Sequence, residues 1–474
     1  MYKKIIAISA AVFIALSCTA CKSSERDAEE SAASNPTQAS EAATSESGSE
    51  APVFKGTATI ERTVMVDEKN VKITAEALEY DDSSANLKLL IENNSEKELT
   101  FICGSKGFDC GSVNGYMVPG MYMNVCAAAG EAVRETVSVT KNNLMLYGIS
   151  DIAEIAIGFD IHDEEYNAYF NTGPRTIETS IADTYDRSSD SFCSALRNER
   201  TGYTVDCCLN DIYSHESGIK VLTEAFVTLG SGDGLLMVET ENTSSEELTA
   251  GIADIYLNGL LVKQGYGEYG TVSPGKKYVC TVTLSSLTDD IGAESFGLSD
   301  ISDISFSVSA HTEDISKRFE PVKISLGLSE DKLSYDGSGT ELYCENGVRI
   351  VSKGIFDEEY GSSVHIPLLA ENSSDRDILL YTNSEYIILL NGKQARFYGD
   401  YVRLAPGEAA AIGINVFDYS LAENGIEGAN DIDNAELAVE ICDTDGKIID
   451  EPVLKLEFTH IDNVGNDAVN NAAE

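Results

Sequence analysis

The chain has 474 residues, 43% of them hydrophobic, which is too long for one ordinary core and enough apolar material for several packed domains. Tryptophan is absent, tyrosine (22) outnumbers phenylalanine (15) and glycine is frequent (38), a mixture that favours strands and turns over helical bundles. A formal net charge of −46 repels polyphosphate chains and anionic lipid, so we expect no nucleic-acid partner.

The first 21 residues have the pattern of an export signal. Lys3 and Lys4 precede an apolar run at 5–16, which has the length of a signal-peptide core and is too short to span a bilayer comfortably. The run ends in Ala-Leu-Ser-Cys-Thr-Ala-Cys (15–21), which resembles the lipobox of bacterial lipoproteins. In that family a small residue precedes a cysteine that receives a diacylglycerol and becomes the mature N-terminus.

The lipobox resemblance implies lipidation at Cys21, with Cys18 as the alternative. Two acyl chains would then hold the protein stably on the extracellular face of the cell membrane. A plain secretory signal cut after a small residue is the other interpretation of this segment.

Residues 22–54 are predicted to be a disordered tether rich in Ser, Glu and Ala. Between residues 22 and 50 there is no Val, Ile, Leu, Met, Phe, Tyr or Cys. Such a segment cannot bury enough apolar surface to offset the entropy lost on ordering. We therefore expect it to hold the folded part of the chain away from the membrane.

The remaining chain contains five short patterns that recur three times in the same order. They are Glu-Asn before x-Ser (asparagines 93, 242 and 372), Asn-Gly (114–115, 258–259 and 391–392), Gly after Ala or Pro (130, 275 and 407), Asp-Ile (151–152, 300–301 and 431–432) and a proline before the last strand (174, 321 and 452). Corresponding positions are offset by 144 to 149 residues and then by 130 to 133. We predict three tandem copies of one unit, at 55–182, 200–327 and 338–463, followed by a polar tail at 464–474.

Each copy is predicted to be all-β. Short runs with period-two alternation are separated by Asn, Gly, Ser and Asp turns. Asn-Gly is the preferred pair for a tight hairpin because both residues tolerate positive φ. The proline favours an edge position for the last strand, and Gly148 and Gly425 are expected to end short helices. About seven strands without βαβ alternation indicate a two-sheet sandwich.

The first copy contains Ile-Glu-Asn-Asn-Ser (91–95), Val-Asn-Gly-Tyr-Met-Val (113–118) and Ile-x-x-Ile-x-Ile-x-Phe (152–159). These sequences resemble the immunoglobulin-like domains of exported and membrane-anchored proteins of low-GC Gram-positive bacteria. The resemblance covers most of residues 55–463 and implies three tandem immunoglobulin-like two-sheet sandwiches on a surface lipoprotein. It implies no particular activity. The inter-sheet cysteine pair and core tryptophan of antibody domains are missing.

No catalytic motif stands out in the sequence. A nucleophilic hydrolase needs Ser or Cys beside a base and an acid, but the five histidines do not recur as a set and no G-x-S-x-G or H-E-x-x-H is present. We therefore expect a non-enzymatic protein with no cofactor and no metal, and an enzyme or enzyme accessory with an inter-domain site remains the alternative.

Acidic turns at 160–165 and 443–450 give a further alternative, a calcium-stiffened stalk, because carboxylate oxygens are the ligands that Ca²⁺ prefers. Asp-Thr-Asp-Gly (443–446) is also ordinary hairpin chemistry. Nine cysteines follow Cys21, an odd number without a CxxC pair, so we expect neither a zinc site nor a disulfide framework. Cys103 and Cys110 are considered as a local bridge, and most others as buried apolar thiols.

The candidate ligand-binding residues come from a repeated aromatic pattern. Tyr-Gly-Glu-Tyr (266–269) and Tyr-Gly-Asp-Tyr (398–401) lie 132 residues apart, and a glycine inside a strand often marks a bulge that re-aims its neighbours. Two tyrosines flanking an acid suit stacking on a sugar or a peptide. The predicted binding residues for an envelope glycan or surface protein are Tyr266, Glu268, Tyr269, Tyr398, Asp400 and Tyr401. The alternatives are that these tyrosines only fill a sandwich edge, or that the copies serve as an envelope spacer.

Overall fold

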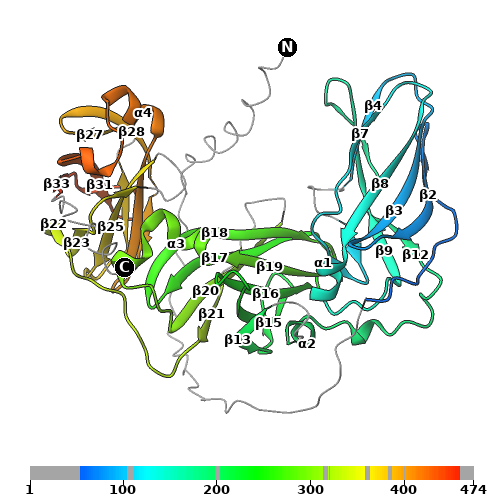
Figure 1. Cartoon of the computed structure of the whole chain (residues 1–474), viewed down its shortest axis with the longest axis horizontal. Helices are drawn as coiled ribbons and strands as arrows, with labels where there is room; N and C mark the ends of the chain where they lie inside the picture. The colour runs from blue at the N-terminus through cyan, green and yellow to red at the C-terminus, as the bar shows by residue number, and fades with distance from the viewer. Residues whose placement is uncertain are drawn as a thin grey trace, which may run out of the picture. The chain divides into compact units, whose positions relative to one another are not determined.

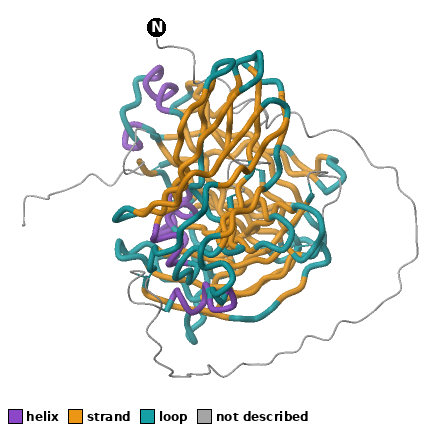
Figure 2. Tube along the Cα trace, turned by 90° about the vertical axis from the view of Figure 1, so that its right-hand side faces the viewer, coloured by secondary structure: helices purple, strands orange, loops and turns teal. Residues whose placement is uncertain are grey.

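The structure is a computed structural model that describes residues 54–103, 111–197, 203–312, 319, 321–357, 363–382, 387–399 and 401–458. The predicted signal peptide with Cys18 and Cys21, nearly all of the tether and the polar tail lie outside these residues. The structure is 54% strand and 9% helix, which confirms the all-β class. Figure 1 shows strands along the whole described chain, and Figure 2 shows that the few helices are short.

The first copy contains two four-stranded antiparallel sheets and part of a third. One has the order β1-β2-β3-β8, and the other has the order β11-β10-β4-β7. The elements are β1 (Thr63–Glu68), β2 (Val71–Tyr80), β3 (Ser84–Asn93), β4 (Leu99–Cys103), β5 (Ser112–Val113), β6 (Tyr116–Met117), β7 (Asn124–Ala127), β8 (Ala132–Thr140), α1 (Lys141–Leu146), β9 (Glu154–Ile157), β10 (Phe159–Asp163), β11 (Ala168–Asn171) and β12 (Arg175–Glu178).

A connecting segment with η1 (Arg187–Ser189) and α2 (Phe192–Leu196) leads to the second copy. There, β13, β15, β16 and β19 lie in one sheet, and β21-β20-β17-β18 follow one another in a second. The elements are β13 (Thr204–Leu209), β14 (Tyr213–Ser214), β15 (Ile219–Thr228), β16 (Gly234–Asn242), β17 (Leu248–Leu257), β18 (Leu260–Val272), β19 (Lys277–Thr283), α3 (Ser285–Thr288), η3 (Asp289–Ile291), η4 (Ala293–Phe296), β20 (Asp303–His311) and β21 (Val322–Gly327).

The third copy repeats this arrangement with more interrupted strands. β25 pairs with β23 and β30, as β16 pairs with β15 and β19 in the second copy. The elements are β22 (Thr340–Glu345), β23 (Val348–Ser352), β24 (Phe356–Asp357), β25 (Val364–Asn372), β26 (Ile378–Thr382), β27 (Ile387–Leu390), β28 (Lys393–Gly399), β29 (Val402–Leu404), β30 (Ala409–Val416), α4 (Asp418–Asn424), η5 (Ala429–Asp431), β31 (Asn434–Cys442), β32 (Ile448–Asp450) and β33 (Val453–Glu457).

The asparagine of each Glu-Asn-x-Ser pattern is a buried polar plug with the same bonds in all three copies. Asn93, Asn242 and Asn372 are 0%, 0% and 1% exposed. Each side-chain amide donates to the carbonyl four residues ahead and to one just before the Ala/Pro-Gly turn, and each side-chain oxygen accepts from the N–H and hydroxyl of the serine two residues ahead. The sequence pattern recurs because a buried asparagine with every polar atom bonded holds this loop closed.

The asparagine of each Asn-Gly pair forms a tight hairpin and bonds to the Asp-Ile pattern of the same copy. Asn114, Asn258 and Asn391 have φ of 48° to 49°, and the following glycines have φ of 77° to 94°, which confirms the predicted tight hairpins. Each asparagine amide also donates to the carbonyl of the aspartate in the Asp-Ile pattern, at 2.9, 2.8 and 2.7 Å. Each asparagine side-chain oxygen accepts from the backbone N–H groups of the residues two and three positions after that aspartate.

Two further local predictions are confirmed. Gly148 (φ 73°) and Gly425 (φ 69°) follow the ends of α1 and α4 in the left-handed conformation that stops a helix. β12, β21 and β33, which the three prolines precede, each pair with a single strand among the described residues. Proline lies in front of these edge strands because its missing N–H leaves no ladder bond unmade there.

The apolar cores and the sheets do not stop at the predicted copy boundaries. The cluster that fills the first copy also contains Met237 and Val279 of the second. The cluster that fills the second contains Val351 and Leu369 of the third. Neighbouring copies also share short parallel pairings, β6 with β19 and β18 with β30. The copies thus share core and sheet contacts, and the copy boundaries at 182, 200, 327 and 338 stay a prediction.

Candidate ligand-binding surface

The tyrosines of the second copy lie on the strand β18 and gather on one exposed face. Tyr266 is opposite Ala253, and Tyr269 is opposite Gly251, both on β17. The two tyrosine rings are 5.4 Å apart, and the Tyr266 ring makes an edge contact at 6.0 Å with His311 of β20. Because the intervening strand β17 carries small residues here, rings from the strands on either side of it meet above it.

Gly251 is essential to this arrangement. A Cβ built on Gly251 would lie 2.3 Å from the carbonyl oxygen of Glu268 and 2.6 Å from the Cβ of Tyr269. Tyr269 is 57% exposed, and Glu268 beside it is also exposed. We call Tyr266, Tyr269 and His311 the aromatic cluster.

The predicted bulge at Gly267 is present, and a second one lies beside it at Gly265. Gly265 (φ 71°) lies opposite Asp254 (φ 47°), where the β17–β18 register shifts, and its N–H donates to the Asp254 carboxylate at 2.9 Å. The β17–β18 register also shifts between Ile252 and Ala253, which pair with Glu268 and Tyr266, so Gly267 is the extra residue of a bulge, as predicted. Gly399 pairs with Ile414 in regular register, so the bulge expected there is not found. A Cβ on Gly267 would lie 2.9 Å from the end of the Ile255 side chain, which would have to shift to admit it.

In the third copy the two predicted tyrosines lie beside different partner strands. Tyr401 stacks on Tyr381 of β26, with ring centroids 5.6 Å apart. Tyr398 lies on β28, opposite Asn415 of β30. Asp400 lies outside the described residues. The separation arises because the chain pairs with β30 through β28 and then with β26 through β29, whereas β18 of the second copy is one continuous strand.

The sequence did not predict that His311 contacts Tyr266 or that Tyr381 contacts Tyr401. Tyr381 occupies the cross-strand position that Gly251 has in the second copy, so one copy places a ring where the other places a gap. Alignment of the two copies contains this signal, but the choice of partner depends on which strands pair.

None of the four predicted tyrosines is buried. Tyr269, Tyr398 and Tyr401 are 57%, 54% and 59% exposed, and Tyr266 is partly exposed. They are therefore not core residues, and the alternative that they fill a sandwich edge stays open. Their role in ligand binding stays a prediction.

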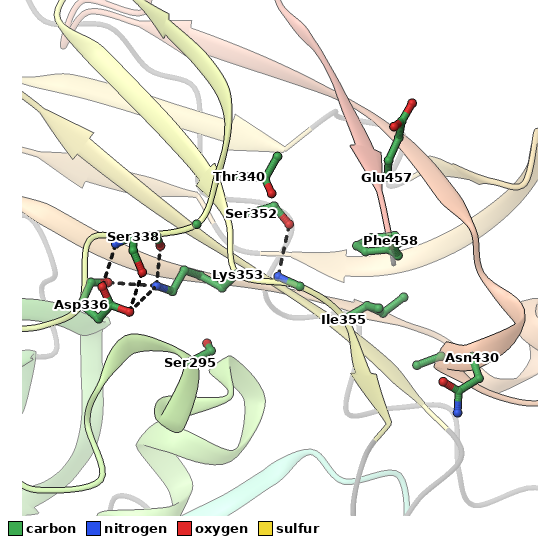
Figure 3. Close-up of a pocket in the computed structure, with 13 residues that line it drawn as sticks. Ser295, Asp336, Ser338, Thr340, Ser352, Lys353, Ile355, Asn430, Glu457 and Phe458 are labelled. Carbon is green, nitrogen blue, oxygen red and sulfur yellow. Dashed lines mark hydrogen bonds and ion pairs between the residues drawn. The ribbon is translucent and has the colours of Figure 1, made fainter. Parts of the chain in front are cut away.

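A polar pocket of about 530 Å³ lies beside β23, where η4 of the second copy approaches the third (Figure 3). The side chain of Lys353 points toward Asp336 and Ser338. Its ammonium donates to their carbonyl oxygens at 3.0 and 2.7 Å and lies 5.3 Å from the centre of the Phe296 ring. Bonds from Ser338 lower the pKa of Asp336. The lining residues include no histidine or cysteine, and their one lysine is already engaged.

The strongest shifts of acid pKa lie away from that pocket. Burial, with a contribution from Asp211, raises the pKa of Glu224 on β15 to about 8. Burial raises the pKa of Asp190 to about 6, although bonds from Tyr185 and Asn114 oppose it. Asp190 of the connecting segment accepts from Asn114 and Tyr185. Beside it, the Tyr116 hydroxyl donates to Glu239 at 2.8 Å, which links the first copy to the second. These acids have structural partners or an apolar setting and do not line the pocket beside β23.

The acidic turns considered for calcium use their carboxylates to hold the turn. Asp163 Oδ1 accepts from the N–H groups of Glu165 and Asn167, and Asp443 Oδ1 accepts from those of Asp445 and Lys447. No group of three or more potential metal ligands converges within the described part of the chain. These hydrogen bonds fit the ordinary turn interpretation, and the calcium alternative stays a prediction.

Two further sequence predictions concern the thiols and the membrane. Cys103 is a buried thiol that donates to the Met121 carbonyl oxygen at 3.0 Å, and Cys110 lies outside the described residues, so their bridge stays a prediction. None of the helices that the structure describes has the length and apolar character needed to cross a membrane.

No protein-family model and no curated protein matches this sequence. Among solved structures, a protein of unknown function from Porphyromonas gingivalis W83 is 12% identical, with a TM-score of 0.15 over 54% of this chain and 100% of that one. The Salmonella enterica SafA pilin in complex with the SafB chaperone is 10% identical, with a TM-score of 0.12 over 48% and 90%. The BSP domain of a biofilm associated protein is 9% identical, with a TM-score of 0.13 over 88% and 68%. At these TM-scores the likeness carries no argument about function.

Proposed function

We propose that this chain is a non-enzymatic lipoprotein of the extracellular face of the cell membrane that binds an envelope glycan through the aromatic cluster of its second copy. The signal pattern and the cysteines at 18 and 21 support export and lipid anchoring. The observation that carries the binding proposal is the gathering of three rings on an exposed strand face.

The chemistry of the cluster fits a sugar. Exposed tyrosine rings are flat, rigid and amphipathic, and they pack against the C–H face of a pyranose while their hydroxyls bond its rim. The Glu268 carboxylate beside them is an acceptor for sugar hydroxyl groups. The net charge of −46 favours a neutral or cationic glycan over an acidic one.

A non-enzymatic role is supported by the polar pocket beside β23. A hydrolase needs a nucleophile beside a base, and the lining supplies serines and threonine without histidine or cysteine. Its lysine is held by two carbonyl oxygens and by an ion pair to Asp336 at 3.6 Å. The pocket therefore offers no activated group.

A spacer in the envelope is the second candidate function. It is favoured by the strand pairings that continue between copies, Tyr116 with Lys277 and Leu261 with Ala410, because such pairings stiffen a tandem array. Spacer and glycan-binding roles make different predictions about ligand capture.

The glycan proposal predicts that the double variant Tyr266→Ala/Tyr269→Ala binds about 10-fold more weakly, because each aromatic contact is worth about 0.5–1.5 kcal/mol. The measurement is binding of the full chain, solubilised in mild detergent, to neutral cell-wall polysaccharide by sedimentation. Tyr166→Ala, which removes a tyrosine that is 72% exposed in the first copy, is the matched control and should bind normally. Equal binding by all three proteins would contradict the aromatic cluster as the site, and no binding by any of them would favour the spacer.

A further inference from the structure

Two cysteines from different elements meet where the connecting segment reaches the second copy. The Sγ atoms of Cys193, on α2, and Cys208, on β13, lie 3.4 Å apart. Both thiols are partly buried, and neither is in a disulfide. The five-residue segment 198–202 between these elements lies outside the described residues.

The position of Cys193 is set by the helix that carries it. Ser191 caps α2 by accepting from the N–H of Ser194, and Phe192 and Leu196 are fully buried in the apolar cluster of the first copy. The backbone of Ser191 also packs on Gly148, where a Cβ would approach it to 2.7 Å. The helix is therefore anchored on the first copy with Cys193 facing β13.

The position of Cys208 is set by strand pairing. Cys208 is opposite Ala225 of β15, and it packs against the apolar cluster of the first copy. Its neighbour Cys207 packs against the cluster of the second copy, because successive residues of a strand point to opposite faces. Only one of these two adjacent thiols can therefore reach Cys193.

The environment activates Cys193 as a nucleophile. The hydrogen bond from Cys208 lowers the pKa of Cys193 to about 6, and although burial opposes this shift, Asn210 and Arg197 act in the same direction as Cys208. The pKa of Cys208 is raised, since it supplies the proton of that hydrogen bond and is itself buried. Burial also raises the pKa of Cys207 and of Cys280, which sets Cys193 apart from these thiols. The thiolate is the reactive form of cysteine.

We propose that Cys193 and Cys208 form a reversible disulfide that ties α2 to β13 when the exported protein meets a small-molecule disulfide. The Cys193 thiolate attacks one sulfur of that oxidant, forms a mixed disulfide and expels one small thiolate. Cys208 then loses its proton, attacks Cys193 Sγ and expels the second small thiolate. Two protein thiols are oxidised to one disulfide, and the small disulfide is reduced to two thiols.

The geometry requires only a short movement. A disulfide has an S–S distance of about 2.05 Å, so the two sulfur atoms must approach by roughly 1.3 Å. The bond would close residues 193–208 into one loop. The bond would thus link the connecting segment, which is anchored on the first copy, to the edge strand β13 of the second.

The test uses the full chain equilibrated with mixtures of oxidised and reduced glutathione. Peptide mass spectrometry without reduction should find a peptide pair joined through Cys193 and Cys208, with the loss of two hydrogen atoms. Cys193→Ser and Cys208→Ser should each abolish this pair, whereas the matched control Cys207→Ser should retain it. A pair that joins Cys193 to Cys207, or full alkylation of Cys208 at every glutathione ratio, would overturn the proposal.

Two further measurements keep the result independent of the variants. Reduction should lower the midpoint of thermal unfolding of the native chain by about 5 °C, because a bridge that closes a loop of this length constrains the unfolded state. The rate of Cys193 alkylation in the reduced protein should rise with pH around 6 and then level off, as expected for its lowered pKa. A rate that rises only above pH 8 would contradict the activation of Cys193.

Discussion

Replacing Glu224 by glutamine should remove a large pH dependence from the stability of the second copy. Glu224 is fully buried on β15, and within the described part of the chain neither carboxyl oxygen has a hydrogen-bond partner. Burial and the nearby charge of Asp211 raise its pKa to about 8, so the folded protein holds the carboxyl group in its neutral form at pH 7. The unfolded chain ionises the same group near its ordinary value of 4.5.

The sign of the effect follows from proton uptake. Between pH 4.5 and about 8 the folded state holds a proton that the unfolded state has lost, so the free energy of unfolding falls as pH rises. The slope is about 1.4 kcal/mol per pH unit, which gives a loss of about 4–5 kcal/mol across the window. Below pH 4.5 and above about 8 this group contributes no further change.

Urea unfolding of the native chain and Glu224→Gln at pH 5 and pH 8.5 measures this difference. Between pH 5 and pH 8.5 the free energy of unfolding should fall less for the variant than for the native chain. Glutamine has the same size as glutamate and no charge to ionise. The exposed side chain of Glu246 provides a matched control, and Glu246→Gln should follow the native protein at both pH values. Parallel pH profiles for the native chain and Glu224→Gln would show that Glu224 is ionised in the fold.

Asn93→Ala should destabilise the first copy by about 3 kcal/mol. The side chain is fully buried and bonds to Lys97 and Ala127 carbonyl oxygens at 2.8 and 2.9 Å, and to the N–H and hydroxyl of Ser95 at 3.0 and 2.6 Å. Alanine would leave these donors and acceptors buried without a partner, and each unsatisfied group costs about 1–3 kcal/mol. Part of this cost is recovered where water enters the loop.

The sequence supplies a control one residue away. Asn94 is exposed, so Asn94→Ala should change the free energy of unfolding by less than about 0.5 kcal/mol. Urea unfolding of both variants, followed by circular dichroism, measures the contrast. Similar free energies for Asn93→Ala and Asn94→Ala would show that the plug does not stabilise the loop. Asn372→Ala should repeat the loss in the third copy, because its bonds are equivalent.

Local chemistry explains which predictions could be made from the sequence. Asn-Gly hairpins, helix-ending glycines and edge prolines depend on the conformational range of one or two residues, and the structure has them at the predicted positions. The all-β class depends on alternation summed over many strands, which tolerates errors at single positions. The recurring Asn of the Glu-Asn-x-Ser pattern was recognised as a landmark, although its buried bonds became clear only in the structure.

The candidate site was predicted only in part, because it depends on strand pairing. Tyr266 and Tyr269 are three residues apart, which on a regular strand would point them to opposite faces, and the register shift at Gly267 brings them together. His311 joins them from β20 across β17. Tyr398 and Tyr401 separate because β28 and β29 have different partner strands. No local pattern encodes which strands will be neighbours.

The sequence by itself determined that this chain folds into strands and repeats its landmarks three times, because both depend on residue type and spacing along the chain. The export signal at 1–21 stays a prediction. Only the tertiary structure decided that Cys193 faces Cys208 and that Glu224 has no partner among the described residues. Contacts of this kind join segments whose distance in space is set by sheet register and core packing, which act together over the whole fold.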